Sequence, residues 1–318
     1  MGTVYHVNVV LPMPAETDIA ALQALIEAEL EDVNARMSTY RADSELSRFN
    51  SHQSTSPFPV SAATLEVFEL ALEISARTNG AFDVTVGPLV NAWGFGPEAT
   101  PENPLSDEEI EALMAHTGYK RIEIDAGRLA VKKEDPEVYC DLSGIAKGYA
   151  VDRLCAAFEK TGYHDYMVEV GGEVRTNGLN GEGVPWRIGI VNPDPVRGDV
   201  ELVVPMSGWA LATSGDYRNF YERNGVRYSH TIDPRTGRPI THNLASVSVI
   251  DKKCAIADGY ATALMVMGPE EAVRWSEENG VIAFFIVREP NGEFRDIATK
   301  DFQKSLEAFR KAIKRSEP

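Results

Sequence analysis

The sequence is poor in cysteine, in long apolar runs and in basic residues. Its three cysteines, Cys140, Cys155 and Cys254, form no C-x-x-C pair, so neither a disulfide framework nor a cysteine zinc site is predicted. No stretch reaches the roughly 18 apolar residues that a membrane-spanning helix needs. Basic residues number 31 against 48 acidic ones, and the resulting net charge of −17 argues against nucleic-acid binding. An anionic ligand would therefore need local neutralisation by a metal or by backbone N–H groups.

The composition is that of a globular protein, with 43% hydrophobic residues, 25 glycines and 18 prolines. Residues 1–10 alternate like a strand and open the chain without a targeting segment, so we expect that an upstream leader has been removed. Periodicity predicts helices at 16–37, 61–78, 106–116, 144–160, 255–267 and 269–278. It predicts strands at 121–124, 128–132, 166–170, 186–191, 202–205, 246–250 and 282–287.

Helices and strands are interspersed without a regular βαβ order, which favours an α+β fold. Ser61 and Ser106 are predicted to cap the helices that follow them. The proline-rich stretch 97–104 is the single candidate linker. Because its two flanks have the same composition, we expect one domain over residues 1–318.

Small residues lead into a predicted helix at Asp141-Leu142-Ser143-Gly144, which continues as Ile145-Ala146-Lys147-Gly148. Backbone N–H groups at a helix start favour phosphate, and glycine permits its close approach. The pattern is neither G-x-G-x-x-G nor a P-loop. A tight turn capped by Asp141 or Ser143 would explain the same residues without a ligand, so both readings stay open.

Asp258 and Thr262 lie four residues apart in an apolar segment, which places both side chains on one face of a helix. Carboxylate and hydroxyl oxygens suit Mg²⁺, which often uses only one or two carboxylates. Alternatively, Asp258 caps a helix that starts one residue later. Against capping, Ala255-Ile256-Ala257 already has helical character, and an aspartate inside an apolar helix is costly unless it has a partner.

His230 lies three residues before Asp233, the first residue of the turn sequence Asp233-Pro234-Arg235-Thr236-Gly237. It can act as a general base near neutral pH, or it can simply support the turn. Aromatic residues near polar loops, among them Tyr40, Phe82 and Trp93, are candidates for stacking on a flat ligand or are edges of the core.

Together these motifs resemble the ApbE family of flavin transferases, over essentially the whole length. The first pieces, in family order, are Met1-Gly2-Thr3, Ser38-Thr39-Tyr40 to Asn50, Gly80 to Val90, and Trp93-Gly94-Phe95-Gly96. The later pieces are Asp141 to Tyr149, Val170-Gly171-Gly172-Glu173, Thr213-Ser214-Gly215, His230 to Pro234, and Asp258 to Thr262. Each piece is modestly specific, whereas nine in order are highly specific.

The resemblance implies binding of FAD with Mg²⁺ and transfer of FMN to a Thr or Ser hydroxyl of a target protein through a phosphoester, with release of AMP. It implies acceptors that are flavoprotein subunits of membrane redox complexes, of the Na⁺-translocating NADH:quinone reductase or a related type. It also implies a periplasmic location, with a lipoprotein anchor in the precursor. Two alternatives use the same residues: a Mg²⁺-dependent FAD pyrophosphatase, and a non-catalytic flavin-binding protein.

The resemblance also assigns roles to individual residues. Gly144, through its carbonyl, Asp258 and Thr262 would hold the metal, and His230 would be the base. Some members have a second acid where this chain has Ala261, and some have Glu in place of Lys147. The residues expected to line the FAD site are Met1, Tyr40, Ala81, Phe82, Asp83, Asp141, Lys147 and Ile232.

Overall fold

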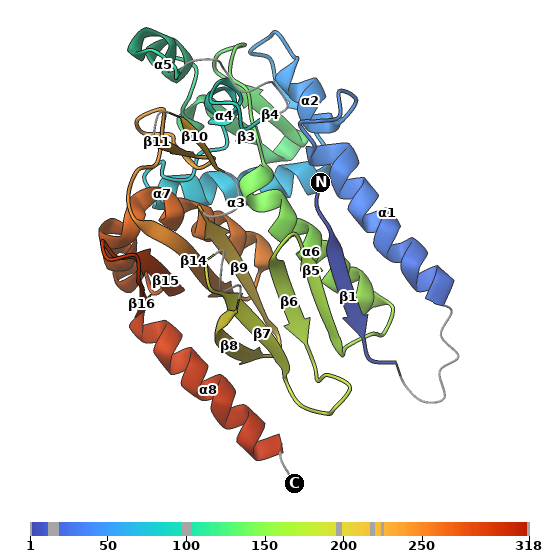
Figure 1. Cartoon of the computed structure of the whole chain (residues 1–318). Coiled ribbons are helices and arrows are strands. Elements are labelled where there is room, and N and C mark those ends of the chain that lie inside the picture. The colour runs from blue at the N-terminus through green and yellow to red at the C-terminus, as the bar shows by residue number, and fades with distance from the viewer. Residues whose placement is uncertain are drawn as a thin grey trace.

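The computed structural model describes residues 2–11, 19–96, 104–194, 199–216, 220–223 and 226–316. Within these ranges, a seven-stranded antiparallel sheet with strand order β1-β5-β6-β9-β14-β15-β16 forms the centre of the molecule (Figure 1). These strands are β1 (Tyr5–Val9), β5 (Tyr166–Val170), β6 (Glu173–Asn177), β9 (Trp209–Gly215), β14 (Leu244–Asp251), β15 (Ile282–Arg288) and β16 (Phe294–Ala298).

Four short sheets accompany the central one. Their strands are β2 (Phe58–Pro59) with β4 (Ala130–Lys133) and β3 (Ile122–Asp125); β7 (Trp186–Val191) with β8 (Val200–Met206); β10 (Phe220–Arg223) with β11 (Val226–Ser229); and β12 (Ile232–Asp233) with β13 (Arg238–Pro239).

The longer helices are α1 (Ile19–Met37), α3 (Ala62–Arg77), α6 (Ser143–Lys160), α7 (Cys254–Asn279) and α8 (Lys300–Ser316). The shorter ones are α2 (Glu45–Asn50), α4 (Gly87–Ala92), α5 (Asp107–Met114) and the 3₁₀ turns η1 (Tyr119–Arg121) and η2 (Ala126–Arg128). In the described part of the chain, no helix is both long enough and apolar enough to span a membrane.

The central sheet is buried on both faces at β14 and β15. In β15, Phe285 and Val287 join the core that includes α7, whereas Phe284 and Ile286 join a second core with β7, β8 and α8. This explains the continuous apolar run Ile282-Ala283-Phe284-Phe285-Ile286-Val287, because a strand covered on both sides needs no polar face. Helices α6 and α7 pack on one face, and α1 covers α6 (Figure 1).

The expected α+β fold is confirmed, and so are the predicted caps. Ser61 accepts from the backbone N–H of Thr64, and Ser106 forms a full capping box with Glu109. The two helices expected at 255–267 and 269–278 are confirmed: they are the two segments of α7, separated by non-helical backbone at Gly268, whose φ is 77°. The start of the helix expected at 16–37 lies outside the described residues.

The alternative reading of the segment before α6, a tight turn capped by Asp141 or Ser143, is right about the turn and wrong about the cap. The N-cap is Leu142, which makes no side-chain capping bond. Asp141 instead accepts a 2.8 Å bond from the backbone N–H of Ser143, which shapes the turn before the helix. The sequence reasoning also missed β6, β9, β16 and α8.

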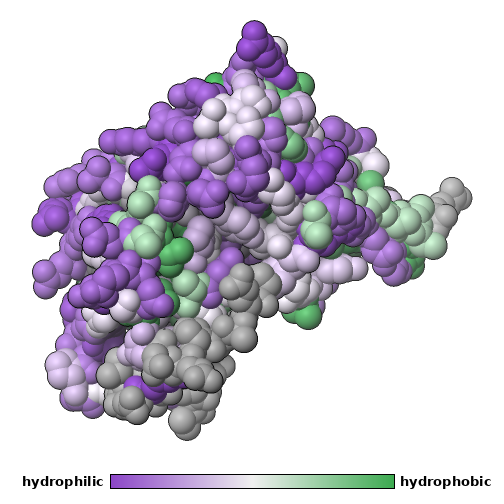
Figure 2. Space-filling model, turned by 90° about the horizontal axis from the view of Figure 1, so that it is seen from above, coloured by the Kyte–Doolittle hydropathy of each residue, from purple (hydrophilic) through white to green (hydrophobic). Residues whose placement is uncertain are grey.

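The surface seen from above Figure 1 is mainly hydrophilic, with hydrophobic residues confined to small patches (Figure 2). The three cysteines are free and buried.

Candidate functional site

A cavity of about 1060 Å³ lies beside the central sheet. Its lining includes every described residue of the predicted FAD, metal and base sets: Tyr40, Ala81, Phe82, Asp83, Asp141, Gly144, Lys147, His230, Ile232, Asp258 and Thr262. Met1 lies outside the described residues. Segments far apart in the sequence therefore meet at one cavity.

Asp258 lies inside α7 and does not cap it, because the helix already begins at Cys254. The capping alternative is therefore wrong. The Asp258 side chain is 2% exposed, and its Oδ2 accepts a 2.9 Å bond from the backbone N–H of Gly148 in α6. Its Oδ1 lies 3.3 Å from Lys147 Nζ.

Gly148 permits this bond because α6 and α7 touch at that point. A Cβ on Gly148 would lie 2.4 Å from the carbonyl oxygen of Cys254 and 2.8 Å from the Cα of Ala255. Only glycine lets the two backbones approach this closely. The close approach aims the amide of one helix at the carboxylate of the other.

Neutral oxygens gather around Thr262, one helical turn after Asp258. Thr262 Oγ1 lies 3.4 Å from the carbonyl oxygen of Gly144 and 3.5 Å from Ser214 Oγ. Adjacent ligands of an octahedral Mg²⁺ are roughly 3 Å apart, since each lies about 2.1 Å from the ion. Small adjustments of the Thr262 and Ser214 side chains would reach that spacing, so these neutral oxygens are compatible with a shared Mg²⁺ ion.

Within the described ranges, no three His, Cys, Asp or Glu side chains form a metal cluster. Mg²⁺ at Asp258 would therefore depend on hydroxyl, carbonyl, water and substrate oxygens as well. A larger residue in place of Gly144 would crowd the site, because a Cβ there would lie 3.1 Å from the Phe82 ring and 3.3 Å from Thr262 Oγ1.

Lys147 lies between two buried carboxylates. Its Nζ is 3.2 Å from Glu173 Oε1 and 3.3 Å from Asp258 Oδ1. Burial by itself would lower the pKa of Lys147, but the charges of Asp258 and Glu173 outweigh it and raise the pKa. Burial and the nearby charge of Asp258 raise the pKa of Glu173. Glu173 lines the cavity, yet the sequence reasoning gave it no role.

The Asp83 carboxylate is held by its own loop and by the first residue of η1. Its carboxylate accepts from Thr85 Oγ1 at 2.6 Å and from the backbone N–H groups of Thr85 at 2.8 Å and Tyr119 at 2.7 Å. Burial raises the pKa of Asp83 and outweighs these bonds, which act in the opposite direction. Burial likewise raises the pKa of Asp141. Both acids thus shape the cavity wall through bonds to neighbouring backbone.

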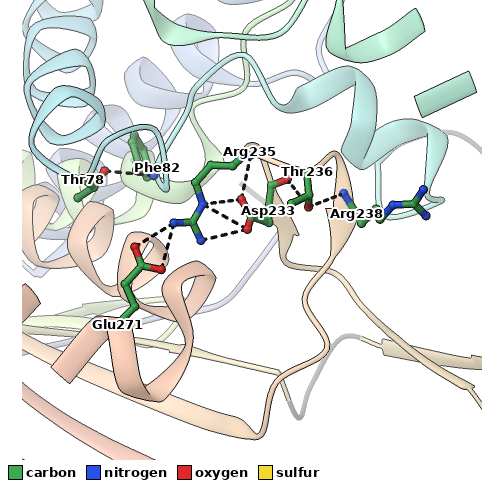
Figure 3. Close-up of polar contacts among 7 residues, drawn as sticks. All are labelled: Thr78, Phe82, Asp233, Arg235, Thr236, Arg238 and Glu271. Atoms are coloured by element: carbon green, nitrogen blue, oxygen red, sulfur yellow. Dashed lines mark hydrogen bonds and ion pairs between the residues drawn. The ribbon is translucent and has the colours of Figure 1, made fainter. Parts of the chain in front are cut away.

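Two of the three aromatic candidates face the cavity. Phe82 lines it, with its backbone N–H bonded to Thr78 Oγ1 at 3.2 Å (Figure 3). The Tyr40 side chain is 73% exposed at the cavity, so one ring face is open to a flat ligand. Trp93 is not part of the lining. It is buried, and its Nε1 donates to the carbonyl of Gly237 at 2.9 Å.

The segment that carries His230 and Ile232 is fixed from several sides. Arg235 bonds Asp233 within the turn and also Glu271 on α7, with Nη1 3.0 Å from Glu271 Oε1 (Figure 3). Gly237 has a φ of 70°, which closes the turn between β12 and β13. His230 lies edge-on to Phe95, with ring centroids 6.4 Å apart. The histidine is therefore presented to the cavity by a well-anchored turn.

Several further lining residues were not singled out from the sequence. They include Asn91, Phe95, Glu173, Arg187, Ser214 and Tyr221. Arg187 and Tyr221 come from the short sheets, whose contact with the cavity depends on tertiary packing. Phe95, Glu173 and Ser214 lie in motifs that the chain shares with the ApbE family. Membership of those motifs was the sequence signal that could have placed them in the site.

Comparison with known proteins identifies the class. The ApbE family model matches residues 1–286. A Vibrio cholerae protein named FAD:protein FMN transferase is 49% identical over 96% of this chain and 90% of its own length. The Escherichia coli K12 protein of the same name is 43% identical over 91% of this chain and 82% of its own length.

Solved structures agree. The flavin transferase ApbE from Vibrio cholerae superimposes with a TM-score of 0.88 at 48% identity, covering 96% of each chain. The ApbE protein of Thermotoga maritima gives a TM-score of 0.81 at 30% identity, covering 94% of this chain and 95% of its own. The chain belongs to the ApbE family.

Proposed function

We propose that this protein is an FAD:protein FMN transferase that uses Mg²⁺ to move FMN from FAD to a Thr or Ser hydroxyl of a target flavoprotein, with release of AMP. One observation carries this proposal: a single cavity is lined by the oxygen groups of Asp258, Thr262 and Gly144 and also by Lys147 and His230. Relatives named FAD:protein FMN transferase support flavin transfer.

In this proposal Asp258, Thr262 and the Gly144 carbonyl hold the metal. When bound, Mg²⁺ polarises the FMN phosphate and neutralises charge that develops on the departing AMP. Lys147 adds a second positive charge beside the pyrophosphate. Tyr40 and Phe82 offer ring faces to the isoalloxazine, and both line the cavity.

His230 is the proposed general base. It would take the proton from the incoming Thr or Ser hydroxyl as the oxygen attacks phosphorus, while the bond from phosphorus to the AMP oxygen breaks. The anchored turn holds the imidazole in place, and positioning is the main contribution that a protein makes to phosphoryl transfer.

The proposed acceptors are flavoprotein subunits of membrane redox complexes of the Na⁺-translocating NADH:quinone reductase type or a related type. The proposed location is the periplasm, with a lipoprotein anchor in the precursor. Both proposals rest on the family resemblance.

Incubation with FAD, Mg²⁺ and a purified acceptor subunit tests the function. We expect the acceptor to gain the mass of FMN less one water, as a phosphoester requires, and one AMP to appear for each FMN transferred. Free FMN and AMP with an unmodified acceptor would instead indicate a pyrophosphatase. FAD binding without any AMP would indicate a non-catalytic flavin-binding protein.

A further inference from the structure

Glu173 is a buried acid whose hydrogen-bonding capacity is only half used. It begins β6, is 2% exposed and lines the cavity. Its Oε1 lies 3.2 Å from Lys147 Nζ, whereas Oε2 has no hydrogen-bond partner within the described residues. A buried carboxylate of this kind is costly to keep unless it serves the site.

Lys147 is shared almost equally by Glu173 and Asp258, at 3.2 and 3.3 Å. Two carboxylates therefore share one ammonium. The lysine stem passes close to Gly171, where a Cβ would lie 3.1 Å from Lys147 Cδ. Gly171 also has a φ of 64°, so a larger residue would be both strained and crowded there. The backbone thus guides the ammonium to the point between the two acids.

The proposed function places Mg²⁺ on Asp258, the carboxylate that Lys147 now contacts. With Asp258 as the sole anion, the ammonium and the metal would compete for it, and one cation would displace the other. Glu173 gives the ammonium a second anchor at the same distance. Both cations can then stay beside an anionic pyrophosphate.

We propose that Glu173 is a positioning residue that draws Lys147 away from the Asp258 carboxylate, so that Mg²⁺ and the ammonium occupy the cavity together. This inference rests on the proposed function, because it needs Asp258 to be a metal ligand. It assigns Glu173 no contact with the reacting atoms.

A double-mutant cycle tests the proposal by calorimetric titration of Mg²⁺ without FAD. Glu173→Gln keeps the side-chain shape, leaves Lys147 on Asp258 alone and should weaken Mg²⁺ binding by about tenfold, within the range seen for contacting charges. Lys147→Met removes the competitor and should strengthen Mg²⁺ binding. In the Lys147→Met background, Glu173→Gln should change Mg²⁺ affinity much less, by under about threefold.

Two controls accompany the cycle. Glu123→Gln makes the same charge change at an exposed pair with Lys132 outside the cavity, and it should leave Mg²⁺ affinity unchanged. Glu173→Asp keeps the charge on a shorter stem and should give an affinity between those of wild type and Glu173→Gln. It also supplies the measurement if Glu173→Gln does not fold, as judged by its thermal melting curve.

The possible outcomes distinguish failure of the role proposed for Glu173 from failure of the proposed metal site. If wild type and Asp258→Ala bind Mg²⁺ alike, the metal site fails and takes the inference with it. If binding needs Asp258 but Glu173→Gln weakens it as much without Lys147 as with it, Glu173 acts on the metal itself and the inference alone is overturned. An unchanged affinity for Glu173→Gln in both backgrounds overturns it as well.

Discussion

The backbone N–H of Gly148 in α6 donates a 2.9 Å hydrogen bond to Asp258 Oδ2 in α7. The bond exists because glycine lets the two helices touch, with a virtual Cβ only 2.4 Å from the Cys254 carbonyl oxygen. A contact between helix backbones therefore sets the orientation of the carboxylate on which the proposed metal site depends.

Gly148→Ala should force α6 and α7 apart, because the obstacle is backbone and cannot rotate away. Overpacking of this kind costs about 1–3 kcal/mol. We expect a lower melting temperature and weaker Mg²⁺ binding. Ala150→Gly, also buried in α6, serves as a control for helix stability. If Gly148→Ala melts like wild type, the helices have more room than the structure gives them.

Asp258→Ala should abolish Mg²⁺-dependent FMN transfer, because it removes the charged member of the oxygen set. Thr262→Val should be milder, since water can replace a neutral ligand. FMN transfer to the acceptor, followed over a range of Mg²⁺ concentrations, gives the comparison. Unaltered transfer by Asp258→Ala would refute the metal site.

Tyr40→Ala should weaken FAD binding by about 1–3 kcal/mol, on the scale of aromatic stacking on nucleic-acid bases. Tyr40→Phe should bind almost normally, because the ring face remains. Since the side chain is 73% exposed, neither change should disturb the fold. Equal FAD affinities for wild type and Tyr40→Ala in a fluorescence titration would remove Tyr40 from the binding site.

His230→Ala should still bind FAD and Mg²⁺ but transfer FMN about 10²–10⁴ times more slowly, the usual contribution of a general base. Rate, FAD affinity and melting temperature should be measured on one preparation. A loss of rate alone supports the base. A parallel fall in all three would mean that His230 supports the turn that begins at Asp233.

Asp296 in β16 provides a test of stability against pH. Burial, and then the charge of Glu201, raise its pKa to about 6. Because this folded value exceeds the ordinary 3.8, the carboxyl stabilises the fold at low pH, and that contribution is lost as pH rises through about 6. Asp296→Asn should therefore melt about 1–3 °C above wild type at pH 8, with little gain at pH 4.

The exposed acid Glu278 in α7 provides the charge-matched control. Glu278→Gln should show no such difference between pH 8 and pH 4. Equal melting temperatures for Asp296→Asn and wild type at both pH values would show that folding does not raise the pKa of Asp296.

Local signals predicted the fold where local chemistry sets the structure. Ser61 and Ser106 were predicted as caps because a cap bonds residues only three positions away. The central strand β9 was missed because Trp209-Ala210-Leu211-Ala212-Thr213-Ser214-Gly215 ends in small and hydroxyl residues, and its pairing partners lie far away in sequence. The amphipathic signal of α8 was present in Phe302, Leu306 and Phe309, which pack against the sheet, but it was overlooked in a highly charged segment.

In the candidate site too, residues related by local sequence were predictable and residues brought together by packing were not. Asp258 and Thr262 were predicted because they share one helix face. The pairing of Lys147 with Glu173 could not be predicted, because it depends on how β6 packs beside α6. Trp93 was open to two readings, ligand stacking or core edge, and the structure confirms the second: the ring is buried in a small core and its indole N–H donates to the Gly237 carbonyl.

Helix α7 also limits where this chain can change length. Before its kink at Gly268 it carries Asp258 and Thr262, and after the kink it carries Glu271, which holds Arg235 in the turn that follows His230. One inserted residue between Thr262 and Gly268 would rotate everything beyond it by about 100° and shift it by about 1.5 Å. Glu271 would then point away from Arg235. Insertions in surface loops would leave the position of Asp258 relative to His230 unchanged. Functional variants with inserted or deleted residues should therefore not have them between Thr262 and Gly268.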